Sequence, residues 1–395
     1  MQNGGTMIIY EIGTGYTSIP ARIGAATEII VEELTLGMQD LKNKVTLFDV
    51  ADDNRLPNEL PIHEVRIPKA LTTMDVQLGI RHKLKRVIYS LALARQLRKA
   101  ISEEKEQVVI HFHNQYNMYF FLKTINKKIR KKAKIAYTVH SYIWANEWAN
   151  IEADIRKRYF QEARCIEQAD CVFVLNNKTR EHFINQLGVD ETKIYKIGNV
   201  VNTNKYCPLE KHVIDSVKGK LELSQKKIIF QVGSVCERKN QVGAIKNLKE
   251  YLKDHREVVY LYAGGIIEQD YQDEIEKYAK ENDISEQIIY LGEIAPGGEL
   301  NRYYNIANLV IFPSEIESFG MVIIEAIAAE ADVLLSTPPI FDLKTGYEVY
   351  QTKEEFEELV DKSLRGNENL NSGREEVVEK YGRNKIANDY CEKWK

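Results

Sequence analysis

The 395-residue sequence contains no uninterrupted run of about 18 apolar residues, so no membrane-spanning helix is expected. Its five cysteines are scattered and none forms a Cys-x-x-Cys pair, which excludes a disulfide scaffold and indicates reduced thiols. Neither sign of charge dominates: 54 Lys and Arg stand against 58 Asp and Glu, which argues against a dedicated nucleic-acid-binding protein. Residues 1–6 show no basic stretch before an apolar one, so we expect no secretion signal and a cytoplasmic protein.

Short apolar runs alternate with longer amphipathic stretches along the chain, which is typical of an α/β protein with parallel sheets. In the first half, the predicted strands are 7–10, 44–50, 108–112, 135–139 and 171–175, and the helices between them 28–36, 83–99, 116–127, 151–168 and 178–187. The pattern restarts with strands at 227–232, 258–263, 288–291, 309–312 and 333–336, and helices at 242–253, 270–281, 300–307 and 321–329. The predicted fold class is therefore α/β, with two Rossmann-like, doubly wound domains.

Residues 199–224 separate the two series and contain Pro208 and a charged run, so we place the domain boundary there, between residues 203 and 204. Two such domains in series are expected to face a central cleft. Ligands of doubly wound sheets bind outside the carboxyl ends of the strands. The candidate site residues are therefore sought where predicted strands end.

The most informative stretch follows the strand at 309–312, where a loop leads into a helix that starts near Gly320. The free backbone amides of Phe319, Gly320 and Met321 at that helix start would attract an anion such as a diphosphate. Glu317 and Glu325 flank this position, and a carboxylate can accept two hydrogen bonds from the vicinal hydroxyls of a ribose or a sugar ring. The alternative is a solvated Glu317 and a Glu325 that pairs along its own helix.

A second candidate segment follows the strand at 227–232, where Gly233 permits a tight exit from the sheet. Arg238 and Lys239 could then neutralise the charge of a leaving diphosphate. The chain has no Asp-x-Asp motif to hold Mg²⁺ for the same purpose, which favours a metal-independent departure. Alternatively, both are solvated residues at a helix start.

In this register the segments resemble the retaining GT-B glycosyltransferases of family 4 (glycosyl transferases group 1), over nearly the whole chain. Glu317 and Glu325 stand at the spacing of the family's E-x7-E motif, and the segment from Gly233 to Lys239 resembles its Gly-Arg…Lys turn. Further matching residues are Asn199, Val201, Asn202, Tyr206 and Pro208 in the linker, Glu167 to Val174 in a strand, and the terminal helix Tyr381 to Trp394.

The resemblance implies a GT-B fold with an acceptor-side domain at 1–203, a donor-binding domain at 204–375 and a C-terminal helix at 376–395 that crosses back to the first domain. It implies transfer of a hexose from a nucleotide diphosphate sugar, with UDP as the expected nucleotide. The anomeric configuration is retained, no cofactor is needed, and the acceptor is a glycan or lipid-linked molecule of cell-surface polysaccharide or glycoconjugate assembly.

By analogy with the family, Glu325 would hold the ribose and Glu317 the donor sugar. The expected catalytic residues are Glu317, His140, Lys239 and Arg238. The expected donor-binding residues are Gly24, Gly233, Ser234, Arg238, Lys239, Ser318, Phe319, Gly320, Met321, Val322 and Glu325.

Three histidines lie at predicted strand ends in the first domain. His140 resembles a family histidine that contacts the donor sugar; the alternative is a hydrogen-bonded core histidine. By alternation His111 and His113 share one strand face. We do not assign them to a metal, because no third ligand has matching spacing and the family implies none. His113 and Asn114 are the expected acceptor-lining residues.

The sequence also departs from the family pattern. Ala25-Ala26 replaces a Gly-Gly pair, for which Gly24 could compensate. Ser234 stands where the family usually has Arg, and Glu330 and Asp332 where it has Gly and Pro. Ser234 and Glu330 leave one rival open, a non-catalytic partner subunit with a degenerate donor site. A second rival is an isomerase on the same fold, such as a UDP-N-acetylglucosamine 2-epimerase. The E-x7-E register argues against the isomerase.

Basic residues gather in two predicted helical segments of the first domain, Lys83–Lys99 and Lys123–Lys134. They could bring the protein to an anionic membrane, at about 1 kcal/mol per basic residue near the surface. Peripheral contact at the inner face of the membrane would suit a lipid-linked acceptor. The alternative is that both segments are ordinary solvated helix faces.

Overall fold

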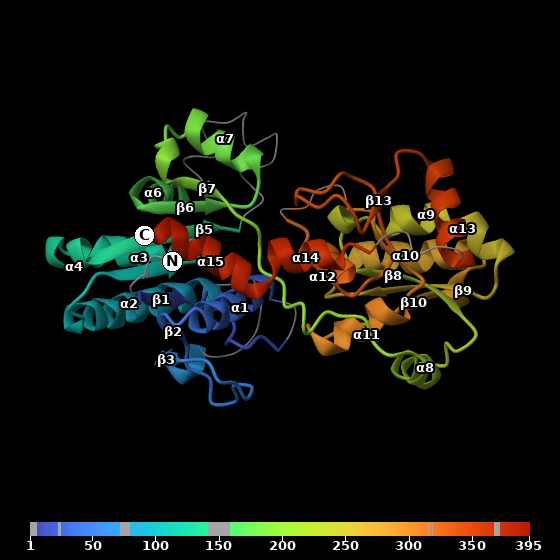
Figure 1. Cartoon of the computed structure of the whole chain (residues 1–395). Coiled ribbons are helices and arrows are strands. Elements are labelled where there is room, and N and C mark those ends of the chain that lie inside the picture. The colour runs from blue at the N-terminus through green and yellow to red at the C-terminus, as the bar shows by residue number, and fades with distance from the viewer. Residues whose placement is uncertain are drawn as a thin grey trace. The chain divides into compact units, whose positions relative to one another are not determined.

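The computed structural model describes residues 6–22, 25–71, 80–140, 159–314, 317, 319–366 and 372–395. The chain divides into two compact units (Figure 1). The first unit comprises Met1–Ala21, Ala25–Val200 and Arg383–Lys395, and the second Arg22–Gly24 and Val201–Gly382. The predicted boundaries are 203/204 and 375/376, whereas the structure divides the chain at Val200/Val201 and Gly382/Arg383.

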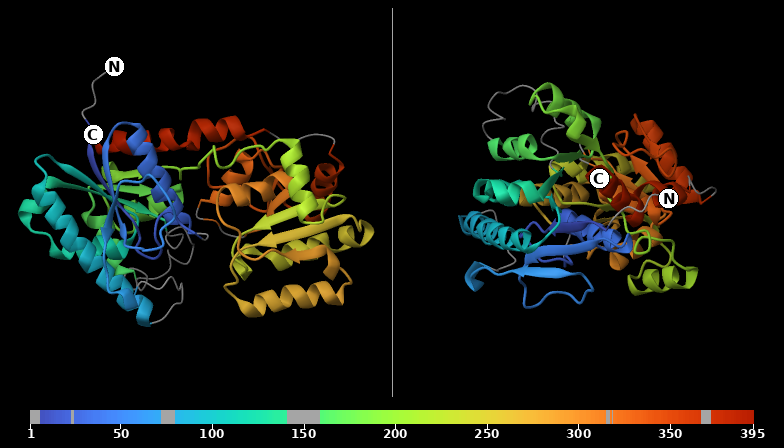
Figure 2. Two further views of the ribbon diagram at one scale, coloured as in Figure 1. Left: turned by 90° about the horizontal axis from the view of Figure 1, so that it is seen from below. Right: turned by 60° about the vertical axis from the view of Figure 1, so that its left-hand side comes forward.

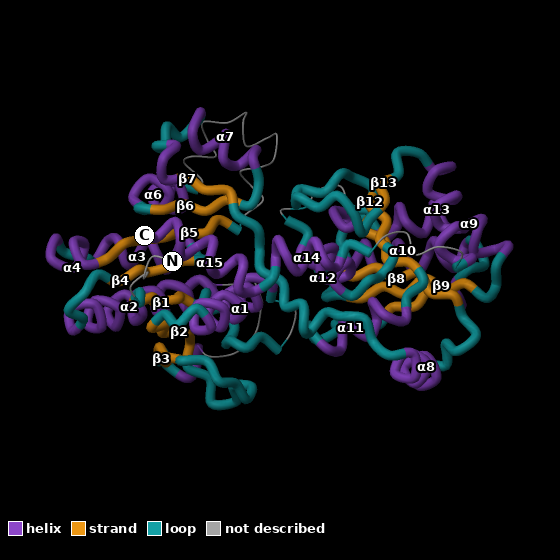
Figure 3. Tube along the Cα trace, in the orientation of Figure 1, coloured by secondary structure: helices purple, strands orange, loops and turns teal. Residues whose placement is uncertain are grey.

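The first unit is built on a parallel sheet of seven strands in the order β3-β2-β1-β4-β5-β6-β7 (Figure 3). The strands are β1 (Ile8–Ile12), β2 (Lys44–Val50), β3 (Ile62–Val65), β4 (Val108–Phe112), β5 (Ala133–Val139), β6 (Cys171–Val174) and β7 (Ile194–Lys196). The central strands β1 and β4 are buried along their whole length. This burial explains why their sequences are mostly apolar, with Glu11 in β1 and His111 in β4 as the exceptions.

Helices cover the sheet of the first unit. They are α1 (Ala26–Asp40), α2 (Ile80–Glu103), α3 (Gln115–Thr124), α4 (Lys127–Lys132), α6 (Phe160–Gln168), α7 (Asn177–Asn185) and α15 (Arg383–Trp394). Helix α3 packs against both α2 and α6, while α1 packs against the C-terminal helix α15 (Figure 2). The α1–α15 contact includes an ion pair between Glu33 and Arg383.

The second unit has a parallel sheet of six strands in the order β10-β9-β8-β11-β12-β13. The strands are β8 (Lys227–Val232), β9 (Val258–Ala263), β10 (Ile288–Tyr290), β11 (Leu309–Phe312), β12 (Val333–Leu335) and β13 (Glu348–Val349). The helices are α8 (Lys211–Lys220), α9 (Gln241–Asp254), α10 (Gln269–Glu281), α11 (Gly298–Ile306), α12 (Met321–Ala328), α13 (Lys353–Arg365) and α14 (Arg374–Tyr381). Because β8 and β11 are neighbours, the loops that follow them lie side by side.

Two sequence-based assignments of helices are wrong. The stretch 116–127 is not one helix: α3 ends before Ile125, and Asn126 caps a new helix, α4, by accepting a hydrogen bond from the amide of Ile129. The terminal helix is interrupted at Gly382, where the Tyr381 carbonyl accepts a hydrogen bond from the amide of Val201 and the chain is extended. The start of the predicted helix 151–168 lies outside the described residues, and α6 begins at Phe160.

At 24 residues, α2 is the longest helix in the described parts of the chain. Neither it nor any other described helix combines the length and the apolar character needed to cross a bilayer.

Candidate functional site

The loop after β8 carries the two cations predicted to meet a diphosphate. Gly233 has φ +151°, and a Cβ there would lie 3.2 Å from the Lys239 side chain. The buried amide of Gln231 donates to the Lys239 carbonyl at 2.8 Å and accepts from the Tyr260 hydroxyl at 2.6 Å. These contacts fix a short turn, Glu237–Lys239, whose cationic side chains are held close to the strand end.

Lys239, Arg238 and Glu317 meet, although they come from two different loops. The buried Lys239 ammonium group donates a hydrogen bond to Oε1 of Glu317, and Nη1 of Arg238 lies 3.9 Å from Oε2. Asn240 ties the same loops together, because its amide donates to the Pro313 carbonyl at 3.2 Å. Two cations from the loop after β8 thus meet one carboxylate from the loop after β11.

Helix α12 begins at Gly320, as predicted. Gly320 is left-handed, with φ 84° and ψ 50°, and a Cβ there would lie 2.9 Å from Ile323, so glycine suits this position. Phe319 is buried against Phe341 and Tyr381, while Met321 and Val322 are half-buried at the start of the helix.

Two residues predicted to bind the donor, Gly24 and Ser318, lie outside the described residues. The sequence interpretation overlooked Ser314, which follows β11 directly. Ser314 is buried, and its hydroxyl has no hydrogen-bond partner in the part of the chain that the structure describes. Its position in the Pro-Ser-x-x-Glu motif was the signal that could have identified it.

Glu325 projects from α12 into a buried environment. Its carboxyl accepts hydrogen bonds from the hydroxyls of Tyr206 and Tyr304, the latter at 3.4 Å. Burial raises the pKa of Glu325 to about 8, and the two hydroxyls offset only part of this effect. In this structure the carboxyl is therefore protonated at neutral pH.

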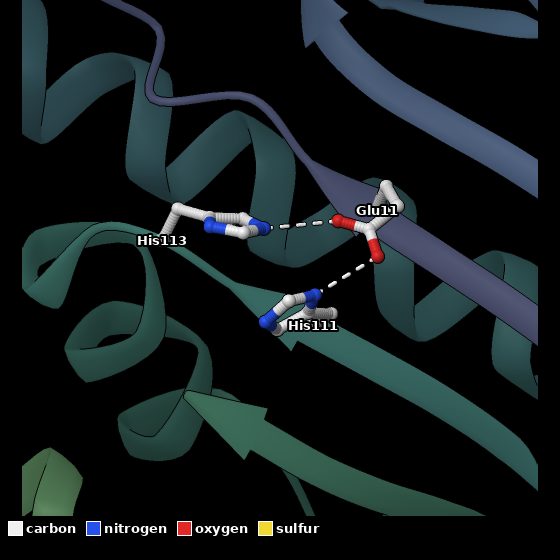
Figure 4. Close-up of side chains that lie close together, drawn as sticks. All are labelled: Glu11, His111 and His113. Atoms are coloured by element: carbon white, nitrogen blue, oxygen red, sulfur yellow. Dashed lines mark hydrogen bonds and ion pairs between the residues drawn. The ribbon is translucent and has the colours of Figure 1, made fainter. Parts of the chain in front are cut away.

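In the first unit, the ends of β1 and β4 bring together a carboxylate and two imidazoles (Figure 4). Glu11 and His111 are register partners, and Nδ1 of His111 lies 2.9 Å from Oε1 of Glu11. Nε2 of His113 lies 3.0 Å from the other oxygen, Oε2. The chain of contacts continues from Nδ1 of His113 to Nε2 of His140, at 3.0 Å. His140 thus ends a line of buried polar groups, as its place after β5 suggests.

The charges of this cluster are unequal. Burial alone would raise the pKa of Glu11, but the two imidazoles lower it to about 2. Burial and the neighbouring His111 lower the pKa of His113 to about 4. Burial and both other imidazoles hold the pKa of His140 well below its usual range. At neutral pH, His113 and His140 are neutral and Glu11 is ionised.

Glu11, the acidic residue in the run Ile-Ile-Tyr-Glu-Ile, was missed because a third ligand was expected at a matching spacing along the chain, whereas Glu11 lies on the neighbouring strand. Ligand atoms of the three residues lie within 4.8 Å of one another, close enough to share a cation. A divalent ion there would leave a net charge of +1 on fully enclosed side chains, which is costly. Hydrogen bonds account for both ring nitrogens of His111 and His113 without an ion.

The two residues predicted to line an acceptor site have other contacts. The side chain of His113 has no exposed surface, so it belongs to the buried network and does not line a surface. Asn114 caps α3 by accepting hydrogen bonds from the amides of Tyr116 and Asn117. Its amide also donates to the Tyr16 hydroxyl at 3.0 Å, which leaves it half-buried.

The loop after β1 places a further carboxyl in the interior. Glu28, in the first turn of α1, accepts a hydrogen bond from the Thr14 hydroxyl. Burial raises the pKa of Glu28 to about 7, although that hydrogen bond lowers it. Lys85 of α2 holds the same loop by donating to the Tyr16 carbonyl at 3.0 Å.

The structure shows the surroundings of two residues that depart from the family pattern, Ser234 and Glu330. The Ser234 carbonyl accepts a hydrogen bond from the buried Gln241 at 3.0 Å, so the backbone there is fixed although the family's Arg is missing. Glu330 has φ +60° directly after α12. Because glycine adopts that conformation with less strain, the family's usual glycine fits the backbone found here.

Comparisons with known proteins agree with this architecture. Residues 27–205 match the family model Glycosyltransferase Family 4, and residues 214–384 match the model Glycosyl transferases group 1. The α-galactosylglucosyldiacylglycerol synthase of Streptococcus pneumoniae is 27% identical over 269 residues, which are 65% of this chain and 67% of that protein. The mannosylglucosylglycerate synthase of Petrotoga mobilis is 27% identical over 249 residues, 55% of this chain and 57% of that protein.

A crystal structure of HepE from Anabaena in complex with UDP and glucose superimposes with a TM-score of 0.71. It covers 99% of both chains at 13% sequence identity, so this likeness concerns the fold. The strand orders, the helix that starts at Gly320 and the two family matches, which together take in most of the sequence, lead to one assignment. The chain belongs to the glycosyltransferases of group 1, family 4, and has the GT-B fold.

Proposed function

We propose that the protein transfers a hexose from a nucleotide diphosphate sugar, with UDP as the nucleotide, and that the anomeric configuration is retained. The observation that carries this proposal is the meeting of Lys239, Arg238 and Glu317 beside the start of α12. The cations would take the negative charge of the departing diphosphate, and the free amides at the helix start would bind its oxygens. Glu325, deeper in α12, would accept hydrogen bonds from the ribose.

In this proposal the leaving phosphate itself takes the acceptor proton, so the protein mainly positions the reactants and stabilises charge. Glu317 would then exchange its contact with Lys239 for one with the donor sugar, which frees the ammonium group for the diphosphate. Neither a metal nor a cofactor takes part. Two relatives, an α-galactosylglucosyldiacylglycerol synthase and a mannosylglucosylglycerate synthase, support a glycan or lipid-linked acceptor.

Calorimetry with UDP and an assay of UDP-, GDP- and ADP-sugars test the donor, and the anomeric configuration of the product tests retention. We expect Glu317→Ala and Lys239→Ala to abolish transfer while the protein stays folded. Lys246→Ala is the matched control, because Lys246 forms a surface ion pair with Glu274 at 3.6 Å in the same unit. Near-wild-type turnover of either active-site variant would refute the roles assigned here.

We also propose peripheral contact with an anionic bilayer through α2 and α4. Leu84, Val87 and Leu91 are 50%, 38% and 45% exposed, and their spacing places them on one face of α2. The exposed Arg95 and Lys99 continue that face toward the C-terminal end of the helix. Apolar side chains beside basic ones suit a membrane interface, where the former enter the headgroup region and the latter attract anionic lipid.

Co-sedimentation with vesicles that contain anionic lipid tests this contact. Binding should weaken when the charge of α4 is reversed by substitution of Lys127, Lys128, Lys131 and Lys132 by Glu, and also in Leu84→Ser. The exposed Lys277 of the second unit provides the control substitution, Lys277→Glu, which should leave binding unchanged. Equal binding by all variants, or by zwitterionic vesicles, would contradict the proposal.

A further inference from the structure

When Glu11 is ionised and His113 is neutral, only one assignment of donors and acceptors fits the hydrogen bonds from Glu11 to His140. An ionised carboxylate can only accept, so Nδ1 of His111 and Nε2 of His113 must both carry hydrogens. A neutral His113 then has a bare Nδ1, which can only accept. The hydrogen of the 3.0 Å contact to His140 must therefore sit on Nε2 of His140.

The other end of the cluster is formed by His111, Thr138 and Tyr390. Nε2 of His111 lies 2.7 Å from the Thr138 hydroxyl oxygen, within hydrogen-bond distance. The Thr138 hydroxyl also forms a hydrogen bond with the Tyr390 hydroxyl of α15 at 3.0 Å, in which either oxygen can be the donor. Both ring nitrogens of His111 therefore have a hydrogen-bond partner.

We propose that Glu11 and His113 are positioning residues that hold His140 as its Nε2–H tautomer, so that its Nδ1 accepts a hydrogen bond from a hydroxyl of the donor sugar. The contact between His140 and a sugar rests on the proposed function. The assignment of the His140 tautomer does not. A bare imidazole nitrogen attracts a hydroxyl hydrogen and repels a phosphate oxygen. The contacts that lead from Glu11 through His113 therefore leave His140 with an acceptor atom that suits a hydroxyl and not a phosphate.

Nitrogen-15 NMR of the full chain, labelled at its eight histidines, reports each tautomer directly. We expect His111 to carry its hydrogen on Nδ1, and His113 and His140 on Nε2. A wild-type His140 protonated on Nδ1 would overturn the proposal. So would stoichiometric zinc in the purified protein, because a cation on Glu11, His111 and His113 would replace these hydrogen bonds.

Two variants test the line of contacts. In His113→Phe the acceptor for His140 is lost, so His140 should become a mixture of tautomers and kcat/KM should fall about tenfold, with the affinity for UDP unchanged. In Glu11→Gln the amide donates one hydrogen bond, so His111 or His113 must change tautomer; if neither changes, the carboxylate does not direct the line. Tyr10→Phe is the control, because Tyr10 lies on the same strand and bonds to Glu104, outside the cluster.

The contact with the sugar has its own readout. Adding UDP-glucose should shift the bare Nδ1 resonance of His140 upfield, while UDP alone should leave it in place. An equal shift with UDP, or no shift when calorimetry shows that UDP-glucose binds, would overturn the assigned contact. Failure of the wild-type protein to bind UDP-glucose would instead contradict the proposed donor and leave the tautomer result standing.

Discussion

Glu11 in the first unit and Glu325 in the second are both buried glutamates, yet their surroundings act on them in opposite directions. The pKa of Glu11 is lowered to about 2, whereas that of Glu325 is raised to about 8. Glu11 accepts from two imidazoles, which can themselves become positive, and Glu325 accepts from two tyrosine hydroxyls, which stay neutral. Two hydrogen bonds are present in each case, so their number does not decide the charge.

The difference shows how the same residue type serves two purposes. A carboxylate that stays ionised when free of ligand gives its neighbours a fixed direction, as Glu11 does for three histidines. A carboxyl that keeps its proton costs less to bury and can still ionise when a ligand brings stronger donors. We therefore regard Glu11 as a permanent part of the scaffold and Glu325 as a group whose charge follows the ligand.

The largest expected effect concerns Glu325 at alkaline pH. Its pKa in the folded protein lies above its ordinary value of 4.5, so the stability it contributes is complete below pH 4.5 and is lost as the pH rises through 8. At about 1.4 kcal/mol per pH unit, the loss reaches about 4 kcal/mol. Glu325→Gln cannot ionise, so it should be as stable as the wild type near pH 4 and melt about 10 °C higher near pH 8.

Calorimetric melting of both proteins across this pH range is the measurement. A constant difference between their melting temperatures would show that Glu325 is ionised in the folded protein, and the comparison with Glu11 would then break down.

Glu11→Gln should act in the opposite sense. Because the pKa of Glu11 in the folded protein lies below 4.5, its contribution is present above pH 4.5 and is lost as the pH falls through 2. At pH 7 the variant should therefore lose about 3 kcal/mol in the free energy of unfolding. Urea denaturation at pH 7 and pH 3 checks this, and the deficit should shrink at the lower pH. A stabilised variant at pH 7 would contradict the assigned charge.

UDP binding should also distinguish Glu325 from Glu11, because Glu325 should release its proton when UDP binds. Ribose hydroxyls that donate to Glu325 favour its ionised form, so binding at pH 7 should release close to one proton, and affinity should rise with pH up to about 8. Calorimetry in buffers of different ionisation enthalpy measures the release. Glu325→Gln corrects for protons lost by UDP itself. Equal release from both proteins would exclude Glu325 as the group that ionises.

Features of the fold could be predicted from the sequence where the signal is local, that is, where it lies in neighbouring residues of the chain. The buried strands and the start of α12 at Gly320 were predicted correctly, because apolar runs and a loop glycine are local signals. Helix α8, inside the predicted linker, was missed because its apolar face is short and only half-buried, and none of its residues is fully buried. The short edge strands β3 and β13 gave equally little signal.

In the candidate site, too, a local motif was recognised, whereas contacts between residues far apart along the chain were not. The E-x7-E spacing identified Glu317 and Glu325, but not their partners. Lys239 lies 78 residues from Glu317 along the chain, and His111 lies 100 residues from Glu11. Such contacts follow from the order of strands in the sheet, which spacing does not encode. The charge of a buried carboxyl was therefore beyond reach of the sequence.

The smallest expected effect concerns Glu28, which lies between the two extremes. It accepts hydrogen bonds from two neutral donors, the Thr14 hydroxyl and its own backbone amide, and its pKa is raised to about 7. As argued for Glu325, a carboxyl with a raised pKa costs the wild type stability when it ionises. Glu28→Gln should therefore become more stable than the wild type from pH 4.5 upward, and this difference in stability should level off near pH 7. Its final value should be about 1 kcal/mol smaller than that of Glu325→Gln. Thr14→Val removes the hydroxyl donor, so in that background the difference should continue to grow toward pH 8. Levelling at the same pH with and without the hydroxyl would show that the hydroxyl does not set the charge of Glu28, and that neutral donors do not rank these carboxyls.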